Sequence, residues 1–140
     1  MSARERISAA IRAANDRGGP ALVGFMTAGY PSRERFREHL QSIASGVDVI
    51  EIGVPFTDPM ADGVTIQRAS RAALAQGVSL RWILSELSAM RLGVPVILMS
   101  YLNPLLAVGL ELLGRTAADA DVAGFIVPDL PLDELSLIHI

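Results

Sequence analysis

The chain repeats one pattern four times: a short apolar run, a loop rich in turn-forming residues, and a helix-like segment. Each apolar run is bounded by residues that break regular structure, which is typical of a buried strand. Alternation of strands and helices predicts parallel strands joined by right-handed crossovers. The expected strands span Ala21–Met26, Val47–Ile52, Val94–Met99 and Val122–Val127.

Helices are expected in the intervening segments, with one before the first strand and two between the second and third. Ser32 and Ser79 are suitable N-caps, because a serine hydroxyl can accept a hydrogen bond from a free N–H of the first helical turn. The expected helices span residues 2–15, 32–45, 63–75, 79–90 and 105–117, and a further one begins at Leu132.

Two α/β architectures fit this order: a doubly wound open sheet, or part of a (β/α)8 TIM barrel. The loops after the strands contain no G-x-G-x-x-G fingerprint, which weakens the case for a dinucleotide-binding open sheet. They do contain polar residues, as the active site of a barrel requires. A closed barrel needs ~250 residues. If the fold is a barrel, the 140 residues form one incomplete domain, residues 1–140, with about the first four β/α units. The strand exits favour this barrel only weakly, and both architectures stay open at this point.

The composition excludes several kinds of chemistry. All twelve basic residues are arginine, so no Schiff base can form on a lysine amine. With no cysteine and only two histidines, the chain is expected to hold no metal. A net charge of -3 without a basic cluster argues against nucleic-acid binding.

Residues 94–113 are apolar but interrupted by Pro, Asn, Gly and Glu, so no membrane span is expected. Without a signal peptide, a cytoplasmic protein is expected.

Glu51 is a carboxylate inside the second apolar run. Side chains alternate along a strand, so Glu51 shares a face with Val49 and lies in a mostly apolar layer. Burial of an ionised carboxylate is costly and raises its pKa, which makes the group a usable general acid near neutral pH. The alternative is structural: Glu51 could pair with an arginine or reach the solvent at the strand end.

Two further carboxylates, Asp58 and Asp62, follow on the loop after this strand. Each has a simple structural explanation. Asp62 could cap the next helix, and Asp58, which precedes Pro59, could shape a turn. Taken together with Glu51, however, the carboxylates form a pattern. Glu51 lies near the end of a strand, and a proline-stiffened loop brings a second carboxylate, Asp62, back toward it.

This region resembles the tryptophan synthase alpha chain family. The stretch from Glu51 to Gly63 reads Glu-Ile-Gly-Val-Pro-Phe-Thr-Asp-Pro-Met-Ala-Asp-Gly, followed by Ile66-Gln67. The other strand exits are also similar to those of the family. They read Phe-Met-Thr-Ala-Gly-Tyr-Pro from Phe25, Met-Ser-Tyr-Leu-Asn-Pro from Met99, and Val-Pro-Asp-Leu-Pro from Val127.

The resemblance implies a TIM barrel that cleaves indole-3-glycerol phosphate to indole and glyceraldehyde 3-phosphate, a retro-aldol step without a Schiff base. By position, Glu51 matches the catalytic acid/base, and Asp62 matches the carboxylate that interacts with the indole N–H. The positions that match the indole pocket are Phe25, Met99, Tyr101 and Ile126. Ordinary core packing is the alternative for Phe25, Met99 and Ile126.

The resemblance also implies a partner, the tryptophan synthase beta chain, in an alpha2-beta2 heterotetramer. Its candidate contacts are Pro55, Asp58, Pro59, Asn103 and Pro131. Pyridoxal phosphate belongs to the beta chain, so this chain is expected to bind no cofactor.

The family holds the substrate phosphate with later strand–loop–helix units, which the 140 residues do not contain. Residues 135–140 also depart from the amphipathic helix expected there. We therefore expect a truncated N-terminal half with a tail that could be foreign. The alternative to an enzyme is a catalytically inactive half-barrel that at most docks on the beta chain.

Overall fold

The computed structural model describes residues 1–134, and these form one sheet of four parallel strands in the order β1-β2-β3-β4. The tail of residues 135–140, and most of the helix expected from Leu132, lie outside the described residues. Each strand ends within one residue of its expected end. Strands β1, β2 and β3 begin two residues later than expected, and β4 begins where expected. The strands are β1 (Val23–Thr27), β2 (Val49–Gly53), β3 (Val96–Met99) and β4 (Val122–Ile126).

Six helices connect and flank these strands in the described part of the chain. The expected caps are partly confirmed: the Ser79 hydroxyl accepts a hydrogen bond from the N–H of Trp82, at the start of α4. Ser2 forms a capping box with Glu5 at the start of α1. The helices are α1 (Ala3–Asp16), α2 (Phe36–Ala44), α3 (Val64–Ala75), α4 (Leu80–Ser88), α5 (Leu102–Val108) and α6 (Leu110–Asp119).

The prediction that Ser32 caps the second helix is wrong. Helix α2 begins four residues later, its N-cap is Arg35, and no side chain caps it. Instead, a residue at the end of α3 holds the loop before α2: the N–H of Arg33 donates a hydrogen bond of 2.9 Å to the Gln76 side chain.

The single helix predicted for residues 105–117 is two helices. Gly109 separates α5 from α6 with φ 88° and ψ 130°, a conformation that favours glycine. Helix α5 also begins earlier than predicted, at Leu102, so Asn103 and Pro104 lie in its first turn. Proline is tolerated there because the first N–H groups of a helix have no partner within it.

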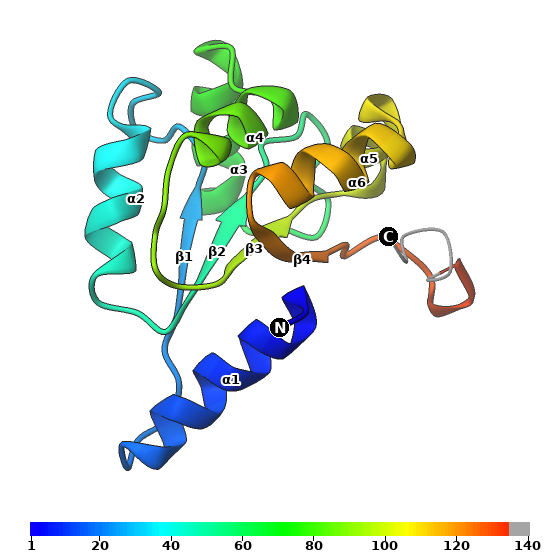
Figure 1. The fold of residues 1–140 in the computed structure, drawn as a ribbon. Helices are drawn as coiled ribbons and strands as arrows, with labels where there is room; N and C mark the ends of the chain where they lie inside the picture. Colours follow the sequence, from blue (N-terminus) through cyan, green and yellow to red (C-terminus); the bar gives the residue numbers. More distant parts are fainter. Residues whose placement is uncertain (135–140) are drawn as a thin grey trace.

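One face of the sheet is packed against helices and forms the core. Ile50, Ile52 and Leu98 point to this face and are fully buried. They pack in one cluster with Phe36 and Leu40 of α2 and with residues of α4 and α6. The helices around the sheet can be followed in Figure 1.

The opposite face, here called the open face, is covered only in part. Its members follow from strand alternation and from the register, which pairs Phe25 with Glu51 and Glu51 with Ile97. Val23 is 48% exposed, Phe25 37% and Ile126 41%. The open face consists of Val23, Phe25, Thr27, Val49, Glu51, Gly53, Ile97, Met99, Gly124 and Ile126.

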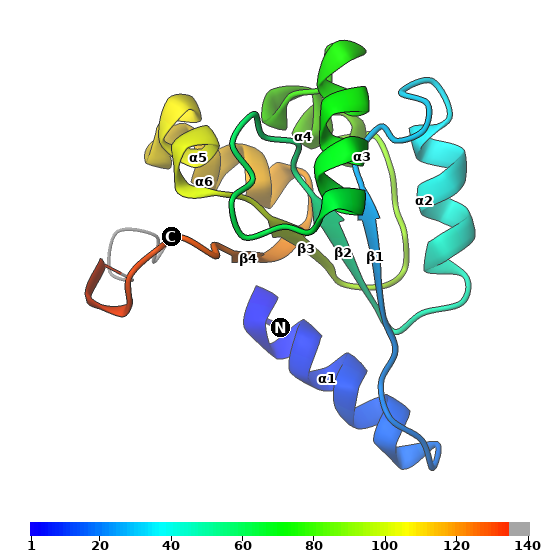
Figure 2. The same ribbon diagram turned by 180° about the vertical axis from the view of Figure 1, so that it is seen from behind.

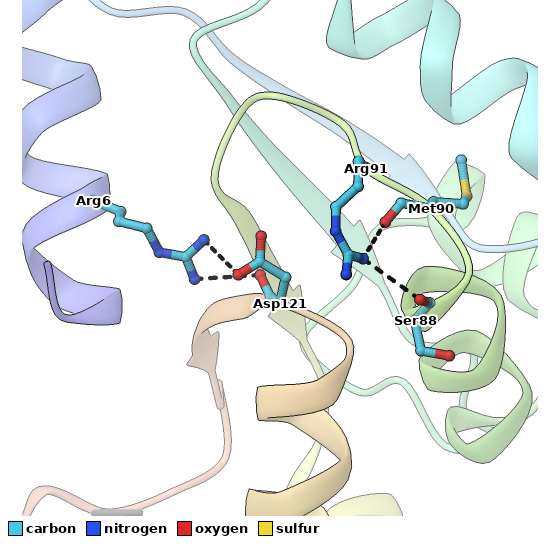
Figure 3. A network of polar contacts seen from close by, with 5 residues as sticks. All are labelled: Arg6, Ser88, Met90, Arg91 and Asp121. Atoms are coloured by element: carbon cyan, nitrogen blue, oxygen red, sulfur yellow. Dashed lines mark hydrogen bonds and ion pairs between the residues drawn. The ribbon is translucent and has the colours of Figure 1, made fainter.

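Helix α1 covers the end of the open face at which β2 and β4 begin. It lies apart from the other helices in both views (Figures 1 and 2). A Cβ placed on Gly124 would lie 3.6 Å from the Cδ1 of Ile7. Arg6 makes an ion pair of 2.7 Å with Asp121, just before β4 (Figure 3). This leaves the other end of the face, where the strands finish, uncovered by α1.

The sheet order and the one-sided cover favour a barrel over a doubly wound sheet. A doubly wound sheet reverses its strand order at a switch point and carries helices on both faces, whereas here consecutive strands are neighbours throughout. Within residues 1–134 there is no helix with the length and apolar character needed to cross a bilayer.

Candidate active site

Glu51 lies in the middle of β2, on the open face, between Phe25 of β1 and Ile97 of β3. Its neighbours across the sheet are apolar and it is half-buried. Partial removal from water raises the pKa of the Glu51 carboxyl above its usual range. The structural alternative, pairing with an arginine, receives no support, because none of the ion pairs found within residues 1–134 includes Glu51.

Gly53 makes room for the aromatic ring of Phe25 on the same face. A Cβ placed on Gly53 would lie 2.8 Å from the Cζ of Phe25, closer than real contacts allow. The ring therefore lies across β2 at the position that follows Glu51 on this face. Any larger residue at position 53 would displace the ring from the neighbourhood of the carboxyl.

Asp62 lies at the end of the long loop between β2 and α3. The loop can be followed from β2 to α3 in Figure 2. The interpretation that it caps α3 is wrong: the N-cap is Gly63, and no side chain accepts a hydrogen bond there. The backbone of Asp62 is nevertheless held, because its N–H donates to Pro59 and its carbonyl accepts from the Gln67 side chain, both over 3.0 Å. The carboxylate is thus not needed for the helix.

Tyr101 follows β3 and connects this loop to the sheet. Its hydroxyl accepts a hydrogen bond of 2.9 Å from the N–H of Ala61, and its ring stacks on Phe56 with 5.3 Å between centroids. Burial raises the pKa of Tyr101, and the negative charges of Asp62 and Asp129 raise it further, against the opposing effect of the Ala61 hydrogen bond. The Tyr101 hydroxyl therefore lies in the electrostatic field of the Asp62 carboxylate.

Met99 and Ile126 end β3 and β4 and are register partners on the open face. Met99 is half-buried and Ile126 is exposed. Together with Phe25 they give the open face an apolar surface at the end of the sheet where the strands finish, on the same face as Glu51. The structure thus brings Glu51, Phe25, Met99 and Ile126 to one face, with Tyr101 and Asp62 at its edge.

The five candidate partner contacts lie on the loops and the helix turn that follow the strands. Asp58, Asn103 and Pro131 are exposed, and Pro59 is half-buried. The Asp58 carboxylate accepts a hydrogen bond of 2.8 Å from the Thr57 hydroxyl. Pro55 is buried, and it lines a small apolar groove together with residues of α4 and α5.

Three residues near the site were missed by sequence reasoning. Phe56 stacks on Tyr101, and Thr27 is 6% exposed on the open face at the end of β1. Asp129 accepts a hydrogen bond of 2.9 Å from the N–H of Leu102 and so caps α5 from the loop after β4. Only Asp129 had a signal, since aspartate is a preferred capping residue, but its helix lies 27 residues earlier in the chain.

The described residues hold no group of three or more His, Asp or Glu side chains that could bind a metal ion. The arrangement places the carboxyl group of Glu51 on a largely apolar face of the sheet and that of Asp62 on the loop at its edge, and carboxyl groups can donate and accept protons.

Comparisons with known proteins identify similar chains. The family model for the tryptophan synthase alpha chain matches residues 11–139. The tryptophan synthase alpha chain of Nitratidesulfovibrio vulgaris is 52% identical over 137 residues, which cover 96% of this chain and 53% of that protein. The alpha chain of Desulfovibrio desulfuricans is 53% identical over 133 residues, which cover 92% of this chain and 52% of that protein. The chain thus spans about half the length of these curated relatives.

Solved structures agree in fold. Tryptophan synthase subunit alpha from Legionella pneumophila str. Paris matches with a TM-score of 0.86 and 35% identity, over 95% of this chain and 52% of that one. Tryptophan synthase from M. tuberculosis, in its aminoacrylate- and BRD0059-bound form, matches with a TM-score of 0.88 and 36% identity, over 95% of this chain and 54% of that one. These neighbours are TIM barrels, which confirms the predicted fold: the four parallel strands are four β/α units of such a barrel.

Proposed function

The chain belongs to the tryptophan synthase alpha chain family, and from this membership we propose that the whole protein cleaves indole-3-glycerol phosphate to indole and glyceraldehyde 3-phosphate. The observation that supports this proposal most is Glu51, a carboxyl of raised pKa on the open face of the sheet. Such a group can hold a proton near neutral pH and deliver it to carbon.

Glu51 acts as the acid/base in this proposal. Protonation of C3 of the indole ring makes the ring an electron sink. The bond between C3 and the glycerol carbon then breaks, its electrons return to the ring, and the neighbouring hydroxyl loses its proton as the aldehyde forms. The substrate never bonds to the protein, in keeping with a chain that has no lysine.

Asp62 stabilises the charge that develops on the ring. Once C3 is protonated, positive charge accumulates on the indole nitrogen, and a carboxylate near its N–H lowers the energy of that state. Phe25, Met99 and Ile126 supply the apolar surface against which the ring packs, and Tyr101 closes its edge. All four come from strands or strand exits of one sheet, which fixes their relative positions.

A beta chain is the proposed partner, in an alpha2-beta2 heterotetramer that works in the cytoplasm and carries pyridoxal phosphate on the beta chain. The loop of residues 54–62 and the exposed side chains of Asp58, Asn103 and Pro131 are the surface offered to it. They share the end of the sheet where the proposed indole site lies, so indole leaves the site next to the partner.

The second candidate concerns the 140-residue chain by itself. Its open face leaves Val23, Phe25 and Ile126 exposed, so a substrate bound beside Glu51 would remain in contact with water. Catalysis through desolvated groups needs water excluded. We infer that this chain alone releases no indole and that at most it docks on the beta chain.

Indole release separates the two candidates. The 140-residue chain is compared with a full-length chimera, in which residues 1–134 are joined to the part of the Nitratidesulfovibrio vulgaris relative that this chain does not match. The chimera is expected to release indole from indole-3-glycerol phosphate, and the short chain is not. A folded chimera without turnover would contradict the proposed function, and turnover by the short chain would contradict the second candidate.

A further inference from the structure

The loop between β2 and α3 is fastened to the sheet through one side chain. Tyr101 is only 5% exposed, so little of its ring is available to a ligand. Its side chain makes one hydrogen bond and one aromatic contact, both with this loop. The hydroxyl accepts a hydrogen bond of 2.9 Å from the N–H of Ala61, and the ring stacks on Phe56 at an interplanar angle of 29°. Phe56 is near the start of the loop and Ala61 near its end, so one side chain holds both halves.

Tyr101 is itself fixed from the opposite side. The N–H of the next residue, Leu102, donates to the Asp129 carboxylate over 2.9 Å. The N–H of Ser100 donates to the carbonyl of Ile126 over 3.0 Å, which extends the pairing of β3 with β4 beyond the strand ends. Tyr101 therefore joins a rigid part of the sheet to a loop that has no regular structure of its own.

We propose that Tyr101 is a positioning residue which, together with Phe56, holds the loop so that the Asp62 carboxylate faces the open face of the sheet. The inference rests on the proposed function, because it assigns Asp62 the role given there. It also adds a second role for Tyr101: its ring lies at the edge of the proposed indole site, and its hydroxyl acts on the substrate through Asp62.

The geometry accounts for this role in physical terms. Asp62 directly follows Ala61, so the hydrogen bond to Tyr101 fixes the backbone one residue from the carboxylate. No side chain caps α3, so the helix itself does not hold the Asp62 side chain in place. A displacement of about 1 Å can cost a reaction ~10²-fold, so a single hydrogen bond at this point matters to the rate.

A first test needs no activity. In the 140-residue chain, Tyr101→Phe keeps the ring and removes the hydroxyl that accepts the Ala61 N–H. The N–H of Ala61 is then expected to exchange with solvent at least about 3-fold faster, since the hydrogen bond that protects it is lost. Tyr30→Phe changes the other tyrosine of the chain, which is exposed, and should leave the exchange unchanged. An unchanged Ala61 exchange rate in Tyr101→Phe overturns the proposal.

A second test uses the full-length chimera and a double-mutant cycle. Tyr101→Phe is expected to lower kcat/KM by about 3- to 10-fold, with Phe56→Leu acting in the same direction. In an Asp62→Asn background, Tyr101→Phe should have no further effect, because it acts through Asp62. Independent, multiplicative effects would overturn the proposal. If the unmodified chimera releases no indole, the proposed function fails, while the exchange of Ala61 still decides whether Tyr101 holds the loop.

Discussion

Glu51 derives its chemistry from its surroundings. It stands on a strand between Phe25 and Ile97, opposite no basic group within the described residues, and burial alone accounts for the rise in its pKa. An arginine beside it would have lowered the pKa and left a permanent carboxylate. The absence of a partner for Glu51 within this part of the chain is therefore what favours an acid over a structural ion pair.

The raised pKa predicts a pH-dependent stability. The folded chain binds the Glu51 proton more tightly than the unfolded chain, whose pKa is near the ordinary 4.5. The stabilisation is therefore complete below that value and is lost as pH rises through the folded pKa. Glu51→Gln lacks this dependence. Urea unfolding of both chains at several pH values should show the glutamine variant gaining relative stability as pH rises from about 4 to 7. A constant or opposite difference would argue against a desolvated carboxyl.

How far the sequence predicts these residues depends on the range of the interactions. Strand alternation predicts that Glu51 shares a face with Val49 and lies among apolar side chains, and the structure agrees. Which of the two faces is packed against helices is shown only by the structure. The role of Asp62 stayed ambiguous, because Asp62 and Gly63 are both good caps and only the backbone angles decide for Gly63. The contact between Ala61 and Tyr101 spans 40 residues, and no local pattern indicates it.

At the scale of elements, the strand exits are connected to one another by hydrogen bonds that the strands themselves do not provide. Asp129, from the exit of β4, caps α5, which follows β3. Tyr101 then connects the exit of β3 to the loop after β2. The exits of three consecutive strands are thus linked by hydrogen bonds next to the proposed site. These links explain how the loop after β2, which has no regular structure, can hold the Asp62 carboxylate in a defined place.

The cap of α5 gives a prediction at this scale. Asp129→Ala removes the acceptor of the Leu102 N–H and is expected to destabilise the chain by ~1 kcal/mol, the usual cost of a lost N-cap. Asp129→Asn keeps an acceptor oxygen and serves as the matched control, with a much smaller loss. Chemical unfolding measures both, and equal stabilities of the alanine and asparagine variants would show that the cap contributes nothing.

Helix boundaries were predicted less well than strands. A single glycine within an apolar helical pattern costs only ~1 kcal/mol and is often tolerated, so residues 105–117 read as one helix. At the observed break Gly109 has a positive φ, and the two helices it separates both pack on α4, while α6 also packs on β4. The start of α2 was missed for a similar reason, since Gln76 of a later segment determines the loop before it.

At the scale of the whole molecule, one face of the sheet is covered by helices, whereas the open face is covered only in part. The helix face holds the fully buried Ile50, Ile52 and Leu98, whereas Val23, Phe25 and Ile126 of the open face remain exposed. The strands β1 and β4 are also unpaired at the outer edges of the described sheet. Exposed apolar area and open strand edges both promote association.

The 140-residue chain is therefore expected to self-associate. Sedimentation velocity should show larger species as the protein concentration rises, and Val23→Glu, on the open face, should reduce them. Leu106→Glu places the same charge on a residue of α5 that is equally exposed, at 48%, but lies outside the open face. An equal effect of both variants, or a monomer at all concentrations, would contradict the idea that the open face drives association.

The central claim is that the Glu51 carboxyl supplies the proton that starts the cleavage. Its most direct test is the turnover of the Glu51→Gln variant of the full-length chimera, measured as indole released from indole-3-glycerol phosphate, with the fold checked by circular dichroism. Glutamine has the same shape but no proton to deliver, so kcat should fall by ~10²–10⁴-fold while the fold is kept. A folded Glu51→Gln variant with near-normal turnover would contradict the account.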